Sequence, residues 1–246
     1  MKPRFTSSDL KLIAMGTMAV DHTAVFLIYV NGYGDFPFWK EIGTAMRLVG
    51  RVAFPLFAFL LVQGFLHTKD RHQYLKRMAV LAVISEIPFN LVASGSPFYA
   101  KEQNTVLLLC IGLLTLKGIH AVSGEADCWG AAAGDQGQRI RVMGIAAASM
   151  AFAWVTKADY GAGGILFILV LYWFRYCPAE RTLAGAAALM LCEGPVNGLA
   201  AWIAFFFINR YNGEKGKELG RLPYLFYPLH LLIIFAAGAL IYGYNF

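Results

Sequence analysis

Apolar runs long enough to cross a lipid bilayer recur from one end of this chain to the other. A helix needs about 20 apolar residues to cross ~30 Å of hydrocarbon, because it rises ~1.5 Å per residue. Hydrophobic residues make up 58% of the chain and charged residues only 15%, a balance that excludes an ordinary water-soluble domain. We therefore expect one all-α domain over residues 1–246, folded as a polytopic integral membrane helix bundle.

Hydropathy and turn signals divide the chain into about nine transmembrane segments. They span residues 10–31, 43–66, 78–95, 104–121, 141–157, 162–176, 182–194, 196–209 and 222–244. The seventh and eighth are short and flank Glu193-Gly194-Pro195, where Gly and Pro together favour a break or a tight turn. A single kinked helix over 182–209 is the alternative.

The distribution of Lys and Arg favours the turn. With the N-terminus inside and nine crossings, 15 of the 21 Lys and Arg residues lie on the inner side and three on the outer side, whereas a single crossing over 182–209 gives 11 against 7. Because inner loops carry the excess of positive charge, we expect nine crossings, or eight and a re-entrant hairpin, with a cytoplasmic N-terminus. The net charge of +6 is then typical of loops that face anionic membrane lipids, and no nucleic-acid partner is expected.

Three basic residues remain within predicted helices, and the first of them is Lys11. Lys11 and His22 are 11 residues apart, which is three helical turns plus about 20°, so both project from one face and lie ~16 Å apart along the axis. This span is comparable to the pantetheine arm of coenzyme A, whose phosphates Lys11 would hold while His22 lies near mid-membrane. The structural alternative is a snorkelling Lys and a His satisfied by a neighbouring helix.

The other two, Arg47 and Arg51, are one helical turn apart and need anionic partners, because like charges at that spacing repel each other. Candidate partners are Asp21, Glu86, a phosphate, or a substrate carbonyl that develops negative charge. A buried ion-pair network that holds the first three helices together is the alternative to a catalytic role. Glu86 could balance the arginines, act as an acid or base, or serve only as a counter-ion.

Polar residues also lie near the predicted outer loops. Asn90 and Asn104 flank one of these loops, where either could bind an acceptor or cap a helix, and we favour capping for Asn104. Asp159 and Tyr160 stand on another outer turn. His230, in the inner half of the last segment, is by itself more often a hydrogen-bonded core residue.

No metal site is expected. His67 and His72 are five residues apart across a basic loop, which is poor ligand geometry, and the four cysteines form no C-x-x-C pair. Nothing in the chain resembles a P-loop or a serine nucleophile elbow.

Five strings spread over nearly the whole chain resemble the TraX family, and they are specific as a set. They are Leu10-Lys11-Leu12-Ile13-Ala14-Met15 through Asp21-His22, Gly50-Arg51-Val52-Ala53-Phe54-Pro55-Leu56-Phe57-Ala58-Phe59, Gly64-Phe65-Leu66-His67-Thr68, Ser85-Glu86-Ile87-Pro88-Phe89-Asn90 and Phe226-Tyr227-Pro228-Leu229-His230.

The resemblance implies an activity. TraX-family proteins are known as pilin acetylases of conjugation systems, which implies acetyl-CoA as donor, the N-terminal amine of a pilin subunit as acceptor, and the bacterial inner membrane as location. The family in turn resembles the acyltransferase-3 superfamily, whose first-helix signature is a basic residue, ten residues and an essential His. Lys11 and His22 have that spacing, with Lys in place of the commoner Arg. A Lys ammonium still attracts phosphate but cannot form the two parallel hydrogen bonds that an Arg guanidinium makes. Acyltransferase-3 proteins commonly modify sugar hydroxyls, so a glycan acceptor stays open.

We expect His22 to deprotonate the amine or hydroxyl, oriented by Asp21 or by a carboxylate from another helix, while Arg51 and Arg47 stabilise the tetrahedral oxyanion. Direct transfer is favoured over a covalent His intermediate. The residues assigned to catalysis are His22, Asp21, Arg51, Arg47 and Glu86, those assigned to acetyl-CoA binding are Lys11, His67, Thr68, Arg77 and His230, and those assigned to the acceptor are Asn90, Asp159 and Tyr160.

Two other classes of protein fit the same intramembrane charges. One is a proton-coupled transporter, for which broken helices around Pro88 and Pro195 are typical. The other is a structural membrane subunit. The spacing from Lys11 to His22 favours the enzyme over both.

Overall fold

The structure, a computed structural model, describes residues 4–124 and 134–242. Within those residues the regular structure is helical, and β-pairing is limited to two isolated bridges. The predicted all-α class is therefore confirmed. Helices suit a chain in lipid because each helix satisfies most of its backbone N–H and C=O groups internally.

The first four helices run from the N-terminus to residue 94. The hydroxyl of Thr6 accepts a hydrogen bond from the backbone N–H of Asp9, whose carboxylate accepts from the backbone N–H of Thr6, so a capping box starts the first helix. The helices are α1, Ser7–Ala24, which continues as a π-helix over Val25–Val30, then α2, Pro37–Gly50, α3, Ala53–His67, and α4, Arg71–Ser94.

The predicted segment 43–66 contains a break that hydropathy alone did not reveal. α2 and α3 form one apolar span of 31 residues, but α2 ends at Gly50 and α3 begins at Ala53. Pro55 lies in the first turn of α3 and has no N–H, so the carbonyl of Arg51, four residues earlier, receives no intrahelical hydrogen bond. Arg51 consequently becomes the C-cap of α2.

The second half of the chain adds six more described helices. α5 begins at Thr105 and is capped by Asn104, whose side chain accepts a hydrogen bond from the backbone N–H of Leu107 at 3.1 Å, so the predicted cap is confirmed. The helices are α5, Thr105–Ser123, α7, Gln136–Val155, α8, Gly161–Trp173, α9, Pro178–Trp202, α10, Ala204–Ile208, and α11, Leu222–Tyr242.

α9 consists of two helical halves that meet at Gly194. Gly194 has φ 79° and ψ 170°, a conformation that is essentially restricted to glycine. A Cβ placed on Gly198 would lie only 2.6 Å from the Cα of Met190, so the second half folds back against the first. The predicted tight turn is therefore present, and the alternative of a single kinked helix is not supported.

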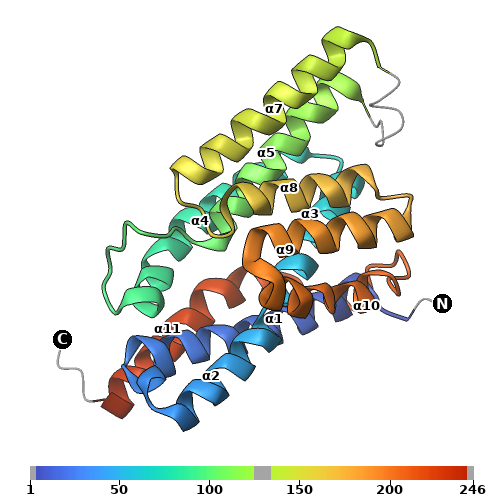
Figure 1. The fold of residues 1–246 in the computed structure, drawn as a ribbon. Helices are drawn as coiled ribbons and strands as arrows, with labels where there is room; N and C mark the ends of the chain where they lie inside the picture. Colours follow the sequence, from blue (N-terminus) through green and yellow to red (C-terminus); the bar gives the residue numbers. More distant parts are fainter. Residues whose placement is uncertain (1–3, 125–133, 243–246) are drawn as a thin grey trace.

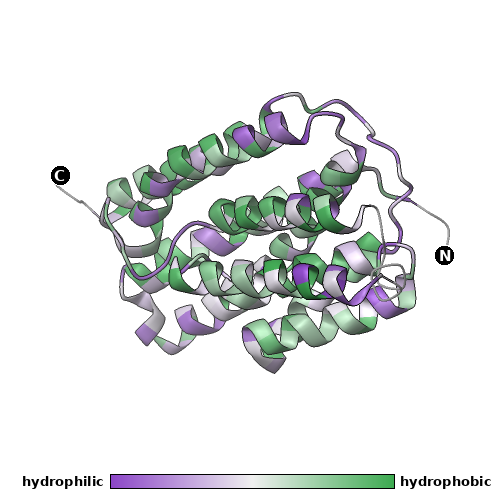
Figure 2. Ribbon diagram, turned by 90° about the horizontal axis from the view of Figure 1, so that it is seen from above, coloured by the Kyte–Doolittle hydropathy of each residue, from purple (hydrophilic) through white to green (hydrophobic). Residues whose placement is uncertain are grey.

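The helices form a bundle in which neighbours along the chain mostly pack side by side (Figure 1). α5, α7, α8 and α9 pack in that order, α1 packs against α2 and α3, and α11 packs against both α4 and α1. The packed interior includes the fully buried rings of Phe26, Phe65, Phe167, Phe205 and Tyr172. Hydrophobic residues run along the helices, whereas hydrophilic residues gather in the connections and at helix ends (Figure 2).

The outside of the bundle is apolar, as expected of a protein surrounded by lipid. Val83, Leu191 and Leu240 are each more than three quarters exposed, which would be unfavourable in water. Six helical spans of the described residues are long and apolar enough to cross a membrane, and one of them is α9 counted over both of its halves. The chain is therefore a multi-pass membrane protein, but the predicted count of about nine crossings is not confirmed. α8, for example, has 13 residues and is only ~20 Å long.

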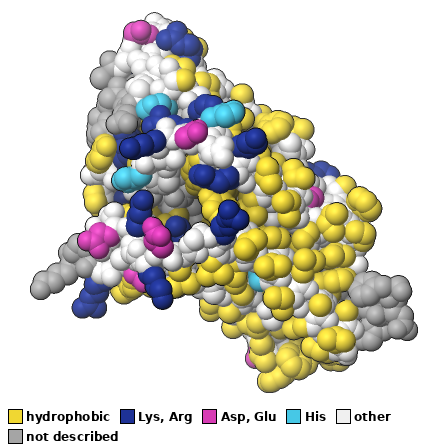
Figure 3. All heavy atoms as spheres, turned by 180° about the vertical axis from the view of Figure 1, so that it is seen from behind, with side chains coloured by type: hydrophobic (Ala, Val, Ile, Leu, Met, Phe, Trp, Pro, Cys, Tyr) yellow, Lys and Arg dark blue, Asp and Glu magenta, His cyan; other side chains and the backbone are white. Residues whose placement is uncertain are grey.

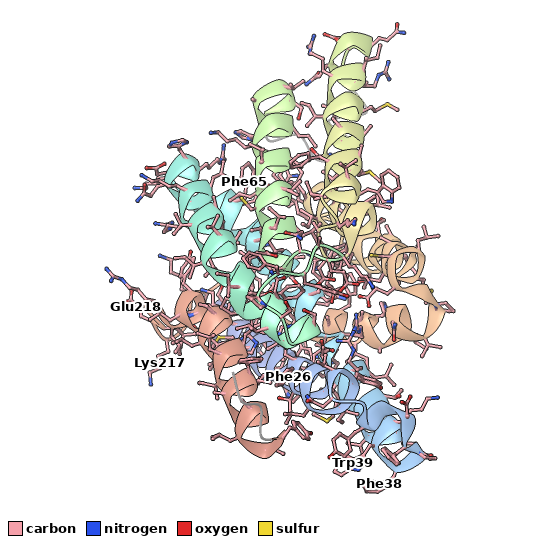
Figure 4. The ribbon with its side chains drawn as sticks, turned by 90° about the vertical axis from the view of Figure 1, so that its left-hand side faces the viewer. Phe26, Phe38, Trp39, Phe65, Lys217 and Glu218 are labelled. Atoms are coloured by element: carbon pink, nitrogen blue, oxygen red, sulfur yellow. The ribbon has the colours of Figure 1, made fainter. Side chains whose placement is uncertain are left out.

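The two ends of the bundle differ in their side chains. At one end, the start of α1 is hydrogen-bonded to the segment that precedes α11, through Arg4 to Arg210 and Ser8 to Lys215. Lys, Arg and His side chains surround a hollow there (Figure 3), and Lys217 and Glu218 project away from the bundle (Figure 4).

Candidate functional site

One cavity of about 340 Å³ lies inside the bundle. It is lined by residues of α1, α3, α4, α5 and α11, by Gly50 at the end of α2, and by the connection between α7 and α8. Its polar lining comprises Lys11, Thr68, Tyr74, Arg77 and Tyr224 from the helix ends near the basic surface, and Asp21, His22, Thr105, Asp159, Tyr160 and Tyr227 from farther inside. The cavity therefore joins a basic opening to a buried polar floor.

α1 contributes a residue to each part of this cavity. Lys11 and His22 both line it, as expected of two residues on one helical face, and their Cα atoms are ~16 Å apart along the axis. Thr68 lies just beyond the end of α3, and Arg77 lies in the first half of α4. The structure thus brings three of the predicted donor-binding residues, Lys11, Thr68 and Arg77, to one opening.

His22 is hydrogen-bonded to a second histidine. Its Nδ1 lies 2.8 Å from Nε2 of His230 in α11, and Nδ1 of His230 lies 2.7 Å from the backbone carbonyl oxygen of Phe226. Sequence reasoning placed His230 with acetyl-CoA and expected a carboxylate to orient His22. The contact joins residues 208 positions apart, which helical periodicity cannot reveal.

Asp21 faces the arginines instead of orienting His22. Its carboxylate accepts a short hydrogen bond from Nη1 of Arg47 and lies 3.8 Å from Nη2 of Arg51. Nη1 of Arg51 donates to Oε2 of Glu193 at 2.7 Å. α2 approaches this closely because Gly50 has no side chain, and a Cβ there would overlap Asp21.

Glu193 is the arginine partner that sequence reasoning missed. Its side chain is only 5% exposed, and it stands directly before the reversal at Gly194. The signal that could have identified it is a lone acidic residue between two apolar runs. Neither Arg47 nor Arg51 lines the cavity described above, so the predicted direct contact between these arginines and an oxyanion is not seen.

Asp159 and Tyr160 form part of the cavity floor, as expected of residues that bind an acceptor. Oδ2 of Asp159 accepts a hydrogen bond from the hydroxyl of Thr105 at 2.5 Å, and burial raises the pKa of the Asp159 carboxyl to about 6. The ring of Tyr160 stacks on Phe54 with centroids 3.9 Å apart. Thr105 and Tyr227 also line the floor; Tyr227 lies in one of the TraX-like strings but was assigned no role, and Thr105 carried no recognisable sequence signal.

Three other predicted residues have different neighbours. Glu86 accepts hydrogen bonds from Asn104 and makes no ion pair with an arginine in the described chain. The side chain of Asn90 donates to the backbone carbonyl of Pro97 at 3.1 Å, which ties down the loop before α5. His67 is exposed and bonds the carbonyl of Gln63. All three lie outside the lining of the cavity, so their roles in catalysis, acceptor binding and donor binding gain no support.

Comparisons with known proteins agree with the motifs in the sequence. The Probable fimbrial assembly protein FimC, serogroup H1, of Dichelobacter nodosus is 26% identical over 259 residues, which cover 95% of this chain and 96% of that protein. No solved structure matches this chain. The family model described as TraX protein matches residues 6–237, which is nearly the whole chain, and the protein therefore belongs to the TraX family.

Proposed function

We propose that this protein is an acyltransferase of the bacterial inner membrane that moves an acetyl group from acetyl-CoA to the N-terminal amine of a pilin subunit. The observation that carries the proposal is a single cavity that runs from a basic opening to His22. We place the basic opening and the N-terminus in the cytoplasm, where acetyl-CoA is found and where positively charged loops are enriched.

The donor would enter at the basic opening. Lys11 and Arg77 offer positive charge for the phosphates of coenzyme A, and Thr68 offers a hydroxyl. The ~16 Å between Lys11 and His22 along α1 suits the pantetheine arm, so phosphates held at the opening bring the thioester carbonyl to His22.

At the floor of the cavity His22 acts as the general base. It removes a proton from the amine as the nitrogen attacks the thioester carbonyl, and a tetrahedral oxyanion forms. When this intermediate collapses, the new C–N bond remains, the C–S bond breaks, and the proton moves from His22 to the departing thiolate. Tyr160 and Tyr227 line the floor, whereas Arg47 and Arg51 do not, so we assign the hydrogen bond to the oxyanion to the tyrosine hydroxyls.

The floor favours an amine over a sugar hydroxyl as acceptor. Asp159 lines the cavity, whereas the carboxylate of Asp21 is already paired with Arg47 and Arg51. A carboxylate attracts an ammonium group but offers no charge complementarity to a neutral hydroxyl. The similarity to a fimbrial assembly protein supports a pilin subunit as the source of that amine. Asp159 would hold the ammonium group until its proton is removed.

Transfer can be measured with the purified protein in lipid nanodiscs. The donor is acetyl-CoA labelled in its acetyl group, and the acceptor is a peptide with the N-terminal sequence of a pilin from the host cell. We expect a mass increase of one acetyl group on the peptide and none on a matched peptide whose N-terminus is already blocked. Acetylation of an oligosaccharide but not of the peptide would refute the amine acceptor.

The transporter alternative is tested in the same preparation. Protein reconstituted into liposomes with a pH-sensitive dye inside should produce no proton flux beyond that of empty liposomes. A flux that depends on His22 and Glu193, without any acetyl transfer, would overturn the enzyme assignment.

A further inference from the structure

We propose that His230 is a positioning residue that fixes the proton of His22 on Nδ1 and thereby makes Nε2 of His22 the basic atom of the site. This inference rests on the proposed function for its kinetic consequences, but the position of the proton is a property of the folded protein alone. Three groups in a row carry the argument: the carbonyl of Phe226, the ring of His230 and the ring of His22.

The carbonyl of Phe226 sets the direction of both hydrogen bonds. A carbonyl oxygen only accepts, so Nδ1 of His230, 2.7 Å away, has to carry a proton. A neutral imidazole has one N–H, and Nε2 of His230 is then an acceptor. Nδ1 of His22 lies 2.8 Å from that acceptor and has to donate to it. The opposite tautomer of His22 would place two lone pairs against each other.

The result is a vacant lone pair on the other nitrogen of His22. Its Nε2 belongs to a ring that lines the cavity, where a substrate amine would lie. Free histidine prefers to carry its proton on Nε2, so without His230 the basic nitrogen would more often be Nδ1, the nitrogen that lies against His230 in α11. His230 therefore decides which nitrogen reaches the substrate.

The ring of His230 is held firmly enough for this task. It is 6% exposed and stacks on Phe226 with centroids 4.7 Å apart and ring planes 6° apart. Tyr227 packs edge-on against both His230, at 5.7 Å, and His22, at 6.3 Å. Packing of this kind fixes the orientation of a residue that acts through its neighbour.

Other charged groups near His22 do not compete for its Nδ1. Asp21 precedes His22 on α1, but its carboxylate is occupied by Arg47 and Arg51. When Nε2 of His22 takes a proton from the substrate, the positive ring is stabilised through its Nδ1–H bond to His230.

The proton can be located directly by nitrogen NMR. Protein labelled with ¹⁵N in its five histidines is placed in lipid nanodiscs, and the signals of His22 are assigned by their loss in His22→Gln. We expect His22 to have a protonated Nδ1 and an unprotonated Nε2 near neutral pH. A His22 ring protonated on Nε2 in the wild-type protein would overturn the inference, whatever the variants do.

The kinetic test uses His230→Leu. Without its acceptor, His22 adopts the other tautomer more often, and kcat for acetyl transfer should fall on the order of 10²-fold. This is less than the ~10⁴-fold loss that a wrong tautomer causes in a serine protease triad, because the freed ring still adopts the active tautomer part of the time. The KM for acetyl-CoA should stay within about twofold, because Lys11 and the opening are unchanged. His230→Gln, whose amide oxygen accepts a hydrogen bond, should recover part of kcat. The matched control is His72→Ala, an exposed histidine of α4.

The two hypotheses fail in different ways. If wild-type protein shows the expected His22 tautomer but transfers no acetyl group, the proposed function fails and the role of His230 in the structure stands. If the wild type transfers acetyl groups and His230→Leu does so at the normal rate, the positioning role fails and the function stands. A fall in the amount of folded His230→Leu leaves the decision to the NMR measurement on the wild type.

Discussion

Two polar clusters meet in the middle of this bundle and use their hydrogen-bonding capacity differently. In the ion-pair cluster, Arg47, Arg51, Asp21 and Glu193 bind one another and tie α1, α2 and the turn in α9 together. In the histidine cluster, His22 and His230 share one hydrogen bond, and the ring of His22 also lines the cavity. Charge within a membrane segment is therefore not by itself a sign of chemistry. What distinguishes the two clusters is that Nε2 of His22 has no hydrogen-bond partner among the described residues, whereas the charged groups of the ion-pair cluster are paired with one another.

The largest effect is expected from His22→Gln. Glutamine keeps hydrogen-bonding capacity but cannot take a proton at neutral pH, so the rate of acetyl transfer should fall by ~10²–10⁴-fold while the amount of membrane protein stays normal. Peptide acetylation and detergent-extracted protein are measured from the same cells. A normal rate at normal abundance would make His22 a packing residue and remove the contrast between the two clusters.

Arg51→Met tests the ion-pair cluster. It leaves Glu193, whose side chain is 5% exposed, as a buried charge without its partner, so stability should fall by ~3–5 kcal/mol. The double variant Arg51→Met with Glu193→Gln should regain much of that loss, because the buried charge is gone. Thermal unfolding in detergent gives the comparison, with exposed Arg141→Met as control. A stable but inactive Arg51→Met would instead indicate a catalytic arginine.

Lys11→Ala tests the opening of the cavity. Loss of a charged hydrogen bond to phosphate should raise the KM for acetyl-CoA by an amount equivalent to ~1.5–3 kcal/mol, with little change in kcat. Lys11→Arg should retain most of the affinity. Lys217→Ala is the matched control, because the side chain of Lys217 projects away from the bundle (Figure 4). An effect on kcat alone would contradict a donor-binding role for Lys11.

Asp159→Asn is expected to give the smallest effect. Removing the carboxylate should raise the KM for the peptide amine about tenfold at neutral pH, equivalent to ~1.4 kcal/mol. Because the pKa of Asp159 is raised to about 6, the carboxylate is mostly ionised above that pH and is lost below it. The wild-type KM should therefore increase as pH falls through about 6, and that of the variant should not. Equal pH profiles for both proteins would exclude Asp159 from binding the amine.

The local features of the fold were predictable, and the long-range pairings were not. Helical spacing was enough to place Lys11 and His22 in one cavity, and Gly194-Pro195 was enough to predict a turn. The break before α3 could have been inferred from Pro55, which hydropathy ignores. The partners of His22 and Arg51 lie 208 and 142 residues away, and a sequence pattern on one helix contains no information about which distant helix packs against it.

The crossing count shows a related limit. Apolar length predicts which segments tolerate lipid, but the 13 residues of α8 and the two halves of α9 are shorter than a bilayer requires. Such segments are stable because neighbouring helices cover them, as α3, α5, α7 and α9 do for α8. Packing of this kind depends on the assembled bundle, so no window along the chain could have settled the count.

The position of α11 has a consequence for how the protein is made. This helix packs against α1 and α4 and supplies both a wall of the cavity and the partner of His22, although it is the last described helix to leave the ribosome. The start of α1 is likewise fastened by the segment over 210–217. Until synthesis is nearly finished, the first helix of the nascent chain therefore lacks the hydrogen-bond partner of His22 and the partners of its own N-terminal residues. A chain that stops before α11 should therefore lack both a wall of the cavity and the partner of His22.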